Sequence, residues 1–450
     1  MVDRLWARFN VLRGDRGFME LIRGSGLVLF FKILGGLSAY IFTLVIGRVF
    51  GADGYGVFEV CFTILMIAGT FSRLGLEGVW IRFFPQFKID QSPAKFKALV
   101  RQSIALISMV SVIIGIAVFL FSGPLSEVFH SPSLKVPFQI TGLILPIYVI
   151  LSLLTEGFRA MKRMKAFSVL QNGSALLLAV IFVPILLPMD IQEDRVAIIA
   201  YGISVLILTM IGGWFFHRSL DRQVISGVRR KVDMNAMLRI SIPIMLTGAL
   251  FYIINWTDTL MLQYFMNETN VGVYQGAFRV ATLITFSQFA INSVFAPMIS
   301  SYFAESDMSS MRRLIRQVGA LNFSFSVPVF LILVLFPETV LGLFGMEFKE
   351  GAGALGILAI SQLFNALSGP NLYILNITGK EKVAQRIMAL VAVMNILLNL
   401  WLIPLHGIMG AALASTVSMV IWNIFATWYV YRYYRIITLS FLDAWIHPRD

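Results

Sequence analysis

Residues 26–50 read GLVLFFKILGGLSAYIFTLVIGRVF, and Lys32 and Arg48 are the only charged residues in the run. About 20 helical residues cross the roughly 30 Å hydrocarbon core of a lipid bilayer. The run therefore predicts a membrane-spanning helix. A second apolar run starts at residue 56, after a short stretch rich in glycine.

The composition extends this prediction to the whole chain. Of 450 residues, 58% are hydrophobic and 13% are charged, whereas a soluble domain carries about 25% charged residues. This composition excludes a soluble enzyme and a disordered chain. A secreted disulfide scaffold is excluded as well, because the chain has only one cysteine, Cys61. We predict an all-α membrane protein with about 12 transmembrane helices, at residues 26–50, 56–77, 103–122, 138–160, 167–188, 196–216, 240–266, 272–303, 318–345, 352–376, 385–405 and 409–434.

The basic residues indicate how these helices are oriented. The chain has a net charge of +12, and 29 of its 36 lysines and arginines lie on the side that holds both termini, against four on the other side. By the positive-inside rule, both termini are cytoplasmic. The positive charge thus reflects topology and contact with anionic membrane lipids, and no nucleic-acid partner is expected.

An internal repeat relates the two halves of the chain. Gly56-Val57-Phe58 corresponds to Gly272-Val273-Tyr274, 216 residues later, and the loops that follow are also alike. Six spans separate the copies, so both halves have the same orientation. This predicts two six-helix lobes related by a pseudo-two-fold axis along the membrane normal, with a central cavity between them. The expected parts are an amphipathic N-terminus (1–25), an N-terminal lobe (26–216), a cytoplasmic linker (217–239), a C-terminal lobe (240–434) and a cytoplasmic tail (435–450).

Several segments resemble a known family. FFKILGGLSAYIFTLVIGRVFGADGYGVFEV (30–60), SRLGLEGVWIRFFPQF (72–87), NWTDTLMLQYFMNETNVGVYQGAFRV (255–280) and HGIMGAALASTVSMVIWN (406–423) are similar to segments of Wzx-type polysaccharide flippases. These form an MviN-like branch of the multidrug/oligosaccharidyl-lipid/polysaccharide exporter superfamily. The resemblance covers nearly the whole chain.

The resemblance implies a function. Such a protein moves an undecaprenyl-diphosphate-linked oligosaccharide, the repeat unit of a surface polysaccharide such as lipopolysaccharide, from the cytoplasmic to the outer leaflet by alternating access. It would lie in the cytoplasmic (inner) membrane of a bacterium, among membrane lipids and other glycan-export proteins. The alternatives are an ion-coupled multidrug or small-molecule exporter of the same superfamily, or a glycan polymerase or ligase, which the short outer loops disfavour.

Three basic residues lie inside predicted spans and away from their ends, where charges are costly and usually functional. They are Lys32, Arg73 and Arg279. By motif position, Lys32 and Arg279 match residues that contact the diphosphate in related lipid II flippases, and Arg73 matches a neighbour of them. Ser38 stands where a further arginine is found in that pattern. A simpler reading is that Lys32 and Arg73 extend to the inner interface.

Two acidic residues are candidates for ion coupling. Asp258 lies in the seventh span at about the depth of Arg279, so it could pair with Arg279, or it could titrate or bind Na⁺ during transport. Glu59 lies one turn into the second span and is expected to pair with Arg48 at the outer interface. The coupling cation would be Na⁺ or H⁺.

Polar and aromatic side chains in the spans could contact the sugars. The candidates are Tyr252, Asn255, Trp256, Gln288 and Asn292, with Asn395 and Asn399 as further polar residues, although interhelical packing is an alternative role for each of them. GAGALG (351–356) opens a predicted span without a preceding strand, which favours helix packing over nucleotide binding. No GxxxxGK sequence and no metal-binding His spacing occur. We therefore expect a transporter that is not an enzyme and has no cofactor or metal.

Overall fold

A computed structural model describes residues 16–89, 93–171, 173–221, 233–436 and 438. All regular structure in these ranges is helical. In the first half of the chain the helices are α2 (Arg16–Arg73), α3 (Leu76–Ile89), α4 (Pro93–Leu120), α5 (Ser122–Val128), η1 (Pro132–Leu134), α6 (Lys135–Ala160), α7 (Met164–Gln171), α8 (Ser174–Leu186), η2 (Leu187–Met189) and α9 (Glu193–Asp221).

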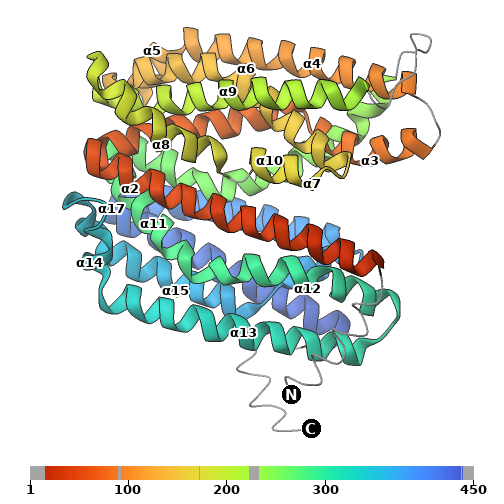
Figure 1. Cartoon of the computed structure of the whole chain (residues 1–450). Helices are drawn as coiled ribbons and strands as arrows, with labels where there is room; N and C mark the ends of the chain where they lie inside the picture. Colours follow the sequence, from red (N-terminus) through yellow and green to blue (C-terminus); the bar gives the residue numbers. More distant parts are fainter. Residues whose placement is uncertain (1–15, 90–92, 172, 222–232, 437, 439–450) are drawn as a thin grey trace.

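The second half repeats this plan. Its helices are α10 (Met234–Phe265), α11 (Glu268–Ala281), η3 (Thr282–Thr285), α12 (Phe286–Ala304), α13 (Met308–Leu335), α14 (Pro337–Leu341), η4 (Glu347–Gly351), α15 (Ala352–Ser368), α16 (Asn371–Ile377) and α17 (Glu381–Tyr434). Helices α4, α6 and α9 pack at one side of the molecule, and α12, α13 and α15 pack at the other (Figure 1).

Two of the helices each contain two predicted spans. The backbone of α2 breaks at Gly51 (φ 69°) and that of α17 at Gly407 (φ 55°), in a conformation that glycine adopts without steric cost. In the described ranges, seven helices are long and apolar enough to cross a membrane, or nine if each of two bent pairs is one span. The predicted all-α, two-lobed membrane fold is confirmed, since all regular structure in the described ranges is helical and the second half of the chain repeats the plan of the first.

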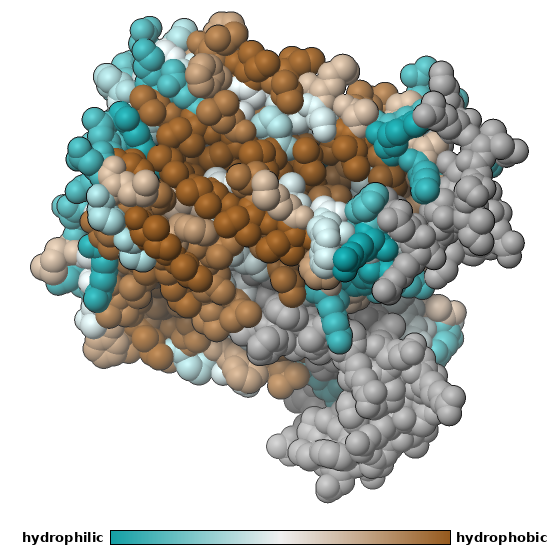
Figure 2. Space-filling view, turned by 45° about the horizontal axis from the view of Figure 1, so that its top comes forward, coloured by the Kyte–Doolittle hydropathy of each residue, from teal (hydrophilic) through white to brown (hydrophobic). Residues whose placement is uncertain are grey.

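The ends of the helices separate into two groups. The short elements α5 and α14 lie at one end of the molecule, and α3 lies at the opposite end (Figure 1). Between hydrophilic groups at its two sides, the face shown in Figure 2 carries a broad band of apolar side chains. This is the distribution that a bilayer requires of a protein that spans it.

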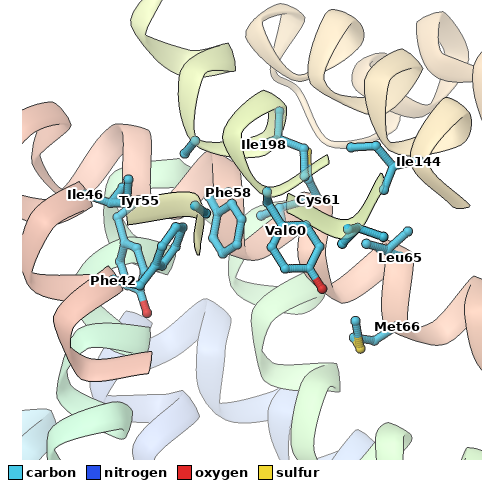
Figure 3. Close-up of a cluster of buried hydrophobic side chains, with 14 of the residues drawn as sticks. Phe42, Ile46, Tyr55, Phe58, Val60, Cys61, Leu65, Met66, Ile144 and Ile198 are labelled. Carbon is cyan, nitrogen blue, oxygen red and sulfur yellow. The ribbon is translucent and has the colours of Figure 1, made fainter. Parts of the chain in front are cut away.

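The N-terminal lobe has an aromatic core at the turn of α2. Phe42, before the break at Gly51, and Phe58, after it, have ring centroids 4.6 Å apart. Tyr55, Phe58 and Cys61 are fully buried in this core (Figure 3). The core holds the two arms of α2 against each other and so fixes where the second arm meets the C-terminal lobe.

Several helices of the C-terminal lobe begin on side chains that cap them. Asp233, Asn267 and Asp307 accept hydrogen bonds from backbone N–H groups in the first turns of α10, α11 and α13, which satisfies donors that a helix start leaves unpaired. Hydrogen bonds from Ser310 and Ser309 lower the pKa of Asp307 to about 2. These caps account for the residues at which the three helices start.

Candidate functional site

The two lobes meet closely where α2 crosses α11. A Cβ atom on Gly56 would lie 1.8 Å from the carbonyl oxygen of Glu268, and one on Gly272 would lie 1.9 Å from the carbonyl oxygen of Ala52. Both glycines and both carbonyls are 216 residues apart, the repeat offset. The crossing is therefore symmetric and lies on the pseudo-two-fold axis, and only glycine fits there.

Polar contacts between the lobes surround this crossing at the predicted outer end. The backbone N–H of Ala52 donates to Glu347 over 2.8 Å, and the hydroxyl of Ser133 donates to Glu268 over 2.8 Å. Thr269 donates to Asp53 over 3.4 Å. These contacts close the outer end of the seam between the lobes.

The lobes also touch at the predicted inner end. Gly75, in the turn between α2 and α3, has a φ of 70°, and a Cβ atom there would lie 2.2 Å from the carbonyl oxygen of Ser241 in α10. The part of the seam that lies between the two ends contains most of the candidate residues whose side chains are described.

Arg279 of α11 bonds across this seam to the N-terminal lobe. Its Nη2 donates to Oε1 of Glu59 over 2.8 Å, and the side chains of Arg279 and Glu59 are 28% and 6% exposed. The hydroxyl of Tyr55 donates to the same Glu59 oxygen over 2.6 Å. From the first arm of α2, the hydroxyl of Tyr40 donates to the backbone oxygen of Arg279 over 2.8 Å.

These contacts differ from the pairings predicted for the charged residues. The expected partner of Glu59, Arg48, donates instead to the backbone oxygen of Leu343 over 2.7 Å. Asp258 is not the partner of Arg279, because it is bonded inside the C-terminal lobe. The first difference arises because Arg48 lies on the exposed side of its arm, next to Leu343, whereas Glu59 is buried.

The side chain of Arg73, at the end of α2, is largely buried, with 12% of it exposed. Its guanidinium donates to Oγ1 of Thr70 over 3.2 Å and lies 3.7 Å from the carboxylate of Glu77. Tyr252 of α10 is a further hydrogen-bond partner of Arg73. Arg73 thus also faces the other lobe across the seam.

Aromatic side chains line the seam between the two arginines. Trp256 of α10 stacks on Phe62 of α2 with ring centroids 5.3 Å apart, and Tyr252 meets Trp256 edge-on at 5.7 Å. Flat aromatic faces of this kind can contact apolar sugar faces or planar drug rings. The structure brings Tyr252 and Trp256 together with Arg73, while Asn255 and Gln288 are half-buried on α10 and α12.

Two predicted site residues have side chains that the structure does not describe. They are Lys32 in α2 and Asn292 in α12. Their roles stay predictions.

Asp258 is the centre of a buried polar network in the C-terminal lobe. Its carboxylate accepts hydrogen bonds from Tyr274 (2.6 Å), from Ser415 and from Asn399 (3.0 Å). Asn399 also donates to Asn395 over 3.1 Å. A buried carboxylate is costly unless its charge is compensated, and here neutral donors from α11 and α17 surround the carboxylate of Asp258.

Two members of this network, Tyr274 and Ser415, are not predicted by the sequence. Tyr274 belongs to the repeat motif, but the repeat does not relate it to Asp258. Ser415 is one of several small residues in its span, and no pattern distinguishes it. Among the described residues, no three His, Cys, Asp or Glu side chains are grouped as a transition-metal site would require.

Comparisons with known proteins agree with this architecture. Residues 21–303 match the family described as polysaccharide biosynthesis protein, and residues 243–401 match the MatE family. The chain is 21% identical over 399 residues to an uncharacterized membrane protein of Methanocaldococcus jannaschii. This alignment covers 83% of this chain and 77% of that protein. It is 29% identical over 178 residues to the probable low-salt glycan biosynthesis flippase Agl15 of Haloferax volcanii, covering 39% of this chain and 37% of that protein.

Solved structures of transporters have the same fold. The lipid II flippase MurJ in an inward closed conformation superposes with a TM-score of 0.66 at 13% identity, covering 94% of this chain and 92% of that chain. The MATE multidrug transporter DinF-BH gives 0.63 at 17% identity, covering 94% and 96%. Because the first of these family models matches more than half of this chain, the chain belongs to the family described as polysaccharide biosynthesis protein.

Proposed function

We propose that this protein translocates a polyprenyl-diphosphate-linked oligosaccharide, of the undecaprenyl type, from the cytoplasmic to the outer leaflet. The observation that carries the proposal is the position of Arg279, an arginine with a partly exposed side chain in the seam between the lobes. A diphosphate needs such a cation on its path, because its charge is costly in a low-dielectric environment. The name of the flippase relative of Haloferax volcanii supports glycan-lipid cargo.

The two lobes would move as units during transport. The N-terminal lobe (26–216) and the C-terminal lobe (240–434) would open the seam first toward one leaflet and then toward the other. The polyprenyl tail would remain in the bilayer while the diphosphate passes the arginines and the sugars pass Tyr252 and Trp256. We propose a place in the cytoplasmic membrane with both termini inside, and a transport step without chemical conversion of the cargo.

A second candidate is an ion-coupled exporter of drugs or other small molecules. The match of residues 243–401 to the MatE family and the buried Asp258 network favour it. The two candidates differ in the charge of the cargo, because a cationic drug would require an uncompensated acid in the seam. The described acids there, Glu59 and Glu77, are both paired with arginines, which favours an anionic cargo.

Complementation of a deletion strain tests the proposal. In the source organism without its own copy of the gene, Lys32→Ala and Arg279→Ala should each reduce glycan export at least about tenfold, the effect of one lost charged hydrogen bond. Arg159→Ala removes an exposed arginine at the predicted inner surface and is the matched control. Membrane levels are compared by immunoblot. Normal export with both Lys32→Ala and Arg279→Ala would exclude a role for these cations in cargo binding.

A further inference from the structure

The ion pair between Arg279 and Glu59 joins the two lobes. The other ion pairs of the described residues lie within one lobe, at Arg73–Glu77, Arg159–Glu156 and Arg195–Asp194. Glu59 follows Gly56 by less than a helical turn, and Arg279 follows Gly272 by two turns. The pair therefore lies directly inside the symmetric crossing that closes the outer end.

Arg279 uses only part of its hydrogen-bonding capacity in this pair. Its Nη2 bonds Glu59, while its Nε has no hydrogen-bond partner among the described residues. A guanidinium can bind a carboxylate or a phosphate through two parallel N–H groups. Glu59 thus occupies one side of a cation that could also bind a phosphate oxygen.

The internal repeat places a neutral amide at the position that corresponds to Glu59. The repeat offset relates Glu59 to Gln275 and Thr43 to Thr259. In the N-terminal lobe, Thr43 bonds Tyr55, which bonds Glu59; in the C-terminal lobe, Gln275 bonds Thr259 directly. A neutral amide therefore serves at the equivalent position. A buried ion pair is also a weak source of stability, because desolvation offsets its attraction.

We propose that Glu59 is an internal substitute for the cargo's phosphate, which holds Arg279 while the outer end is closed and is displaced when a lipid diphosphate binds. Displacement would break the one described ion pair between the lobes and so favour outer opening. A ligand shifts a conformational equilibrium only by binding one state more tightly. Here the difference arises because Arg279 is occupied in the closed state and free in the open one. This inference rests on the proposed function.

Spin labels on the outer surface can measure the opening. Cys61 is the only cysteine and is buried, so Cys61→Ser gives a background for labels at Val128→Cys in the N-terminal lobe and Met346→Cys in the C-terminal lobe, both exposed positions. Electron–electron distance measurements in lipid nanodiscs, with and without farnesyl diphosphate, give the distance between the two labels at the outer ends of the lobes. In the otherwise unchanged chain, farnesyl diphosphate should produce a second population with a longer distance between the labels.

Two variants should distinguish the role of the Arg279–Glu59 ion pair in closure from the role of Arg279 in binding the diphosphate. Glu59→Gln should show the longer distance without ligand and bind farnesyl diphosphate about tenfold more tightly, because the competing carboxylate is gone. Arg279→Gln should also show the longer distance but bind at least about tenfold more weakly. A merely structural ion pair would not give opposite changes in affinity. Glu59→Asp, a milder change, should fall between the unchanged chain and Glu59→Gln.

Glu156→Gln is the matched control, because it removes an acid that is paired with Arg159 inside the N-terminal lobe, and it should leave the outer distance unchanged. Glu59→Gln and Glu59→Asp with unchanged distances and affinity would overturn the inference, even if farnesyl diphosphate binds and the proposed function stands. If neither the unchanged chain nor Glu59→Gln binds farnesyl diphosphate, both the displacement step and the lipid-diphosphate function fail.

Discussion

At the scale of the residue, Asp258 is the described side chain best suited to sense a cation. Its carboxylate is buried and receives three neutral hydrogen bonds, so a bound Na⁺ or H⁺ would remove an uncompensated charge. If Na⁺ binds, the melting temperature of the unchanged protein should rise when NaCl replaces choline chloride, because a ligand stabilises the state that binds it. Asp258→Asn should abolish most of this rise, whereas Ser415→Ala, which removes one donor, should reduce it less. Equal shifts in all three proteins would exclude Asp258 as a Na⁺ ligand.

At the scale of the element, the crossing of α2 and α11 requires two glycines. Gly56→Ala or Gly272→Ala would place a methyl group less than 2 Å from a backbone oxygen, so the helices must separate. We expect each change to destabilise the protein by about 1–3 kcal/mol, the usual cost of overpacking, and the two effects to be similar because the crossing is symmetric. Gly356→Ala, in α15, meets no atom within 4 Å and is the control. Thermal unfolding in detergent measures all three, and equal melting temperatures would contradict a close crossing.

The elements also show what the sequence could predict. Apolar runs predict membrane-spanning helices, and the repeat offset relates Gly56 to Gly272, the two glycines that meet at the crossing. The partner of Arg279 could not be predicted, because depth along a helix says nothing of which neighbour a side chain faces. That choice depends on how the break at Gly51 turns the second arm of α2, and on the rotation of α10, which directs Asp258 toward Tyr274. Both are properties of packing between segments far apart in the chain.

At the scale of the whole molecule, alternating access requires that the outer contacts break in every cycle. Asp53 and Thr269 are related by the repeat offset, lie in opposite lobes and touch through a 3.4 Å hydrogen bond. Cysteines at both positions, with Cys61→Ser, should form a disulfide on mild oxidation that holds the outer end closed. Export should then fall to the level of the deletion strain and return when a reductant cleaves the bond. Each single cysteine variant, treated in the same way, should export normally. Full export by the cross-linked protein would mean that the lobes do not separate at this crossing, and that cargo passes by another route.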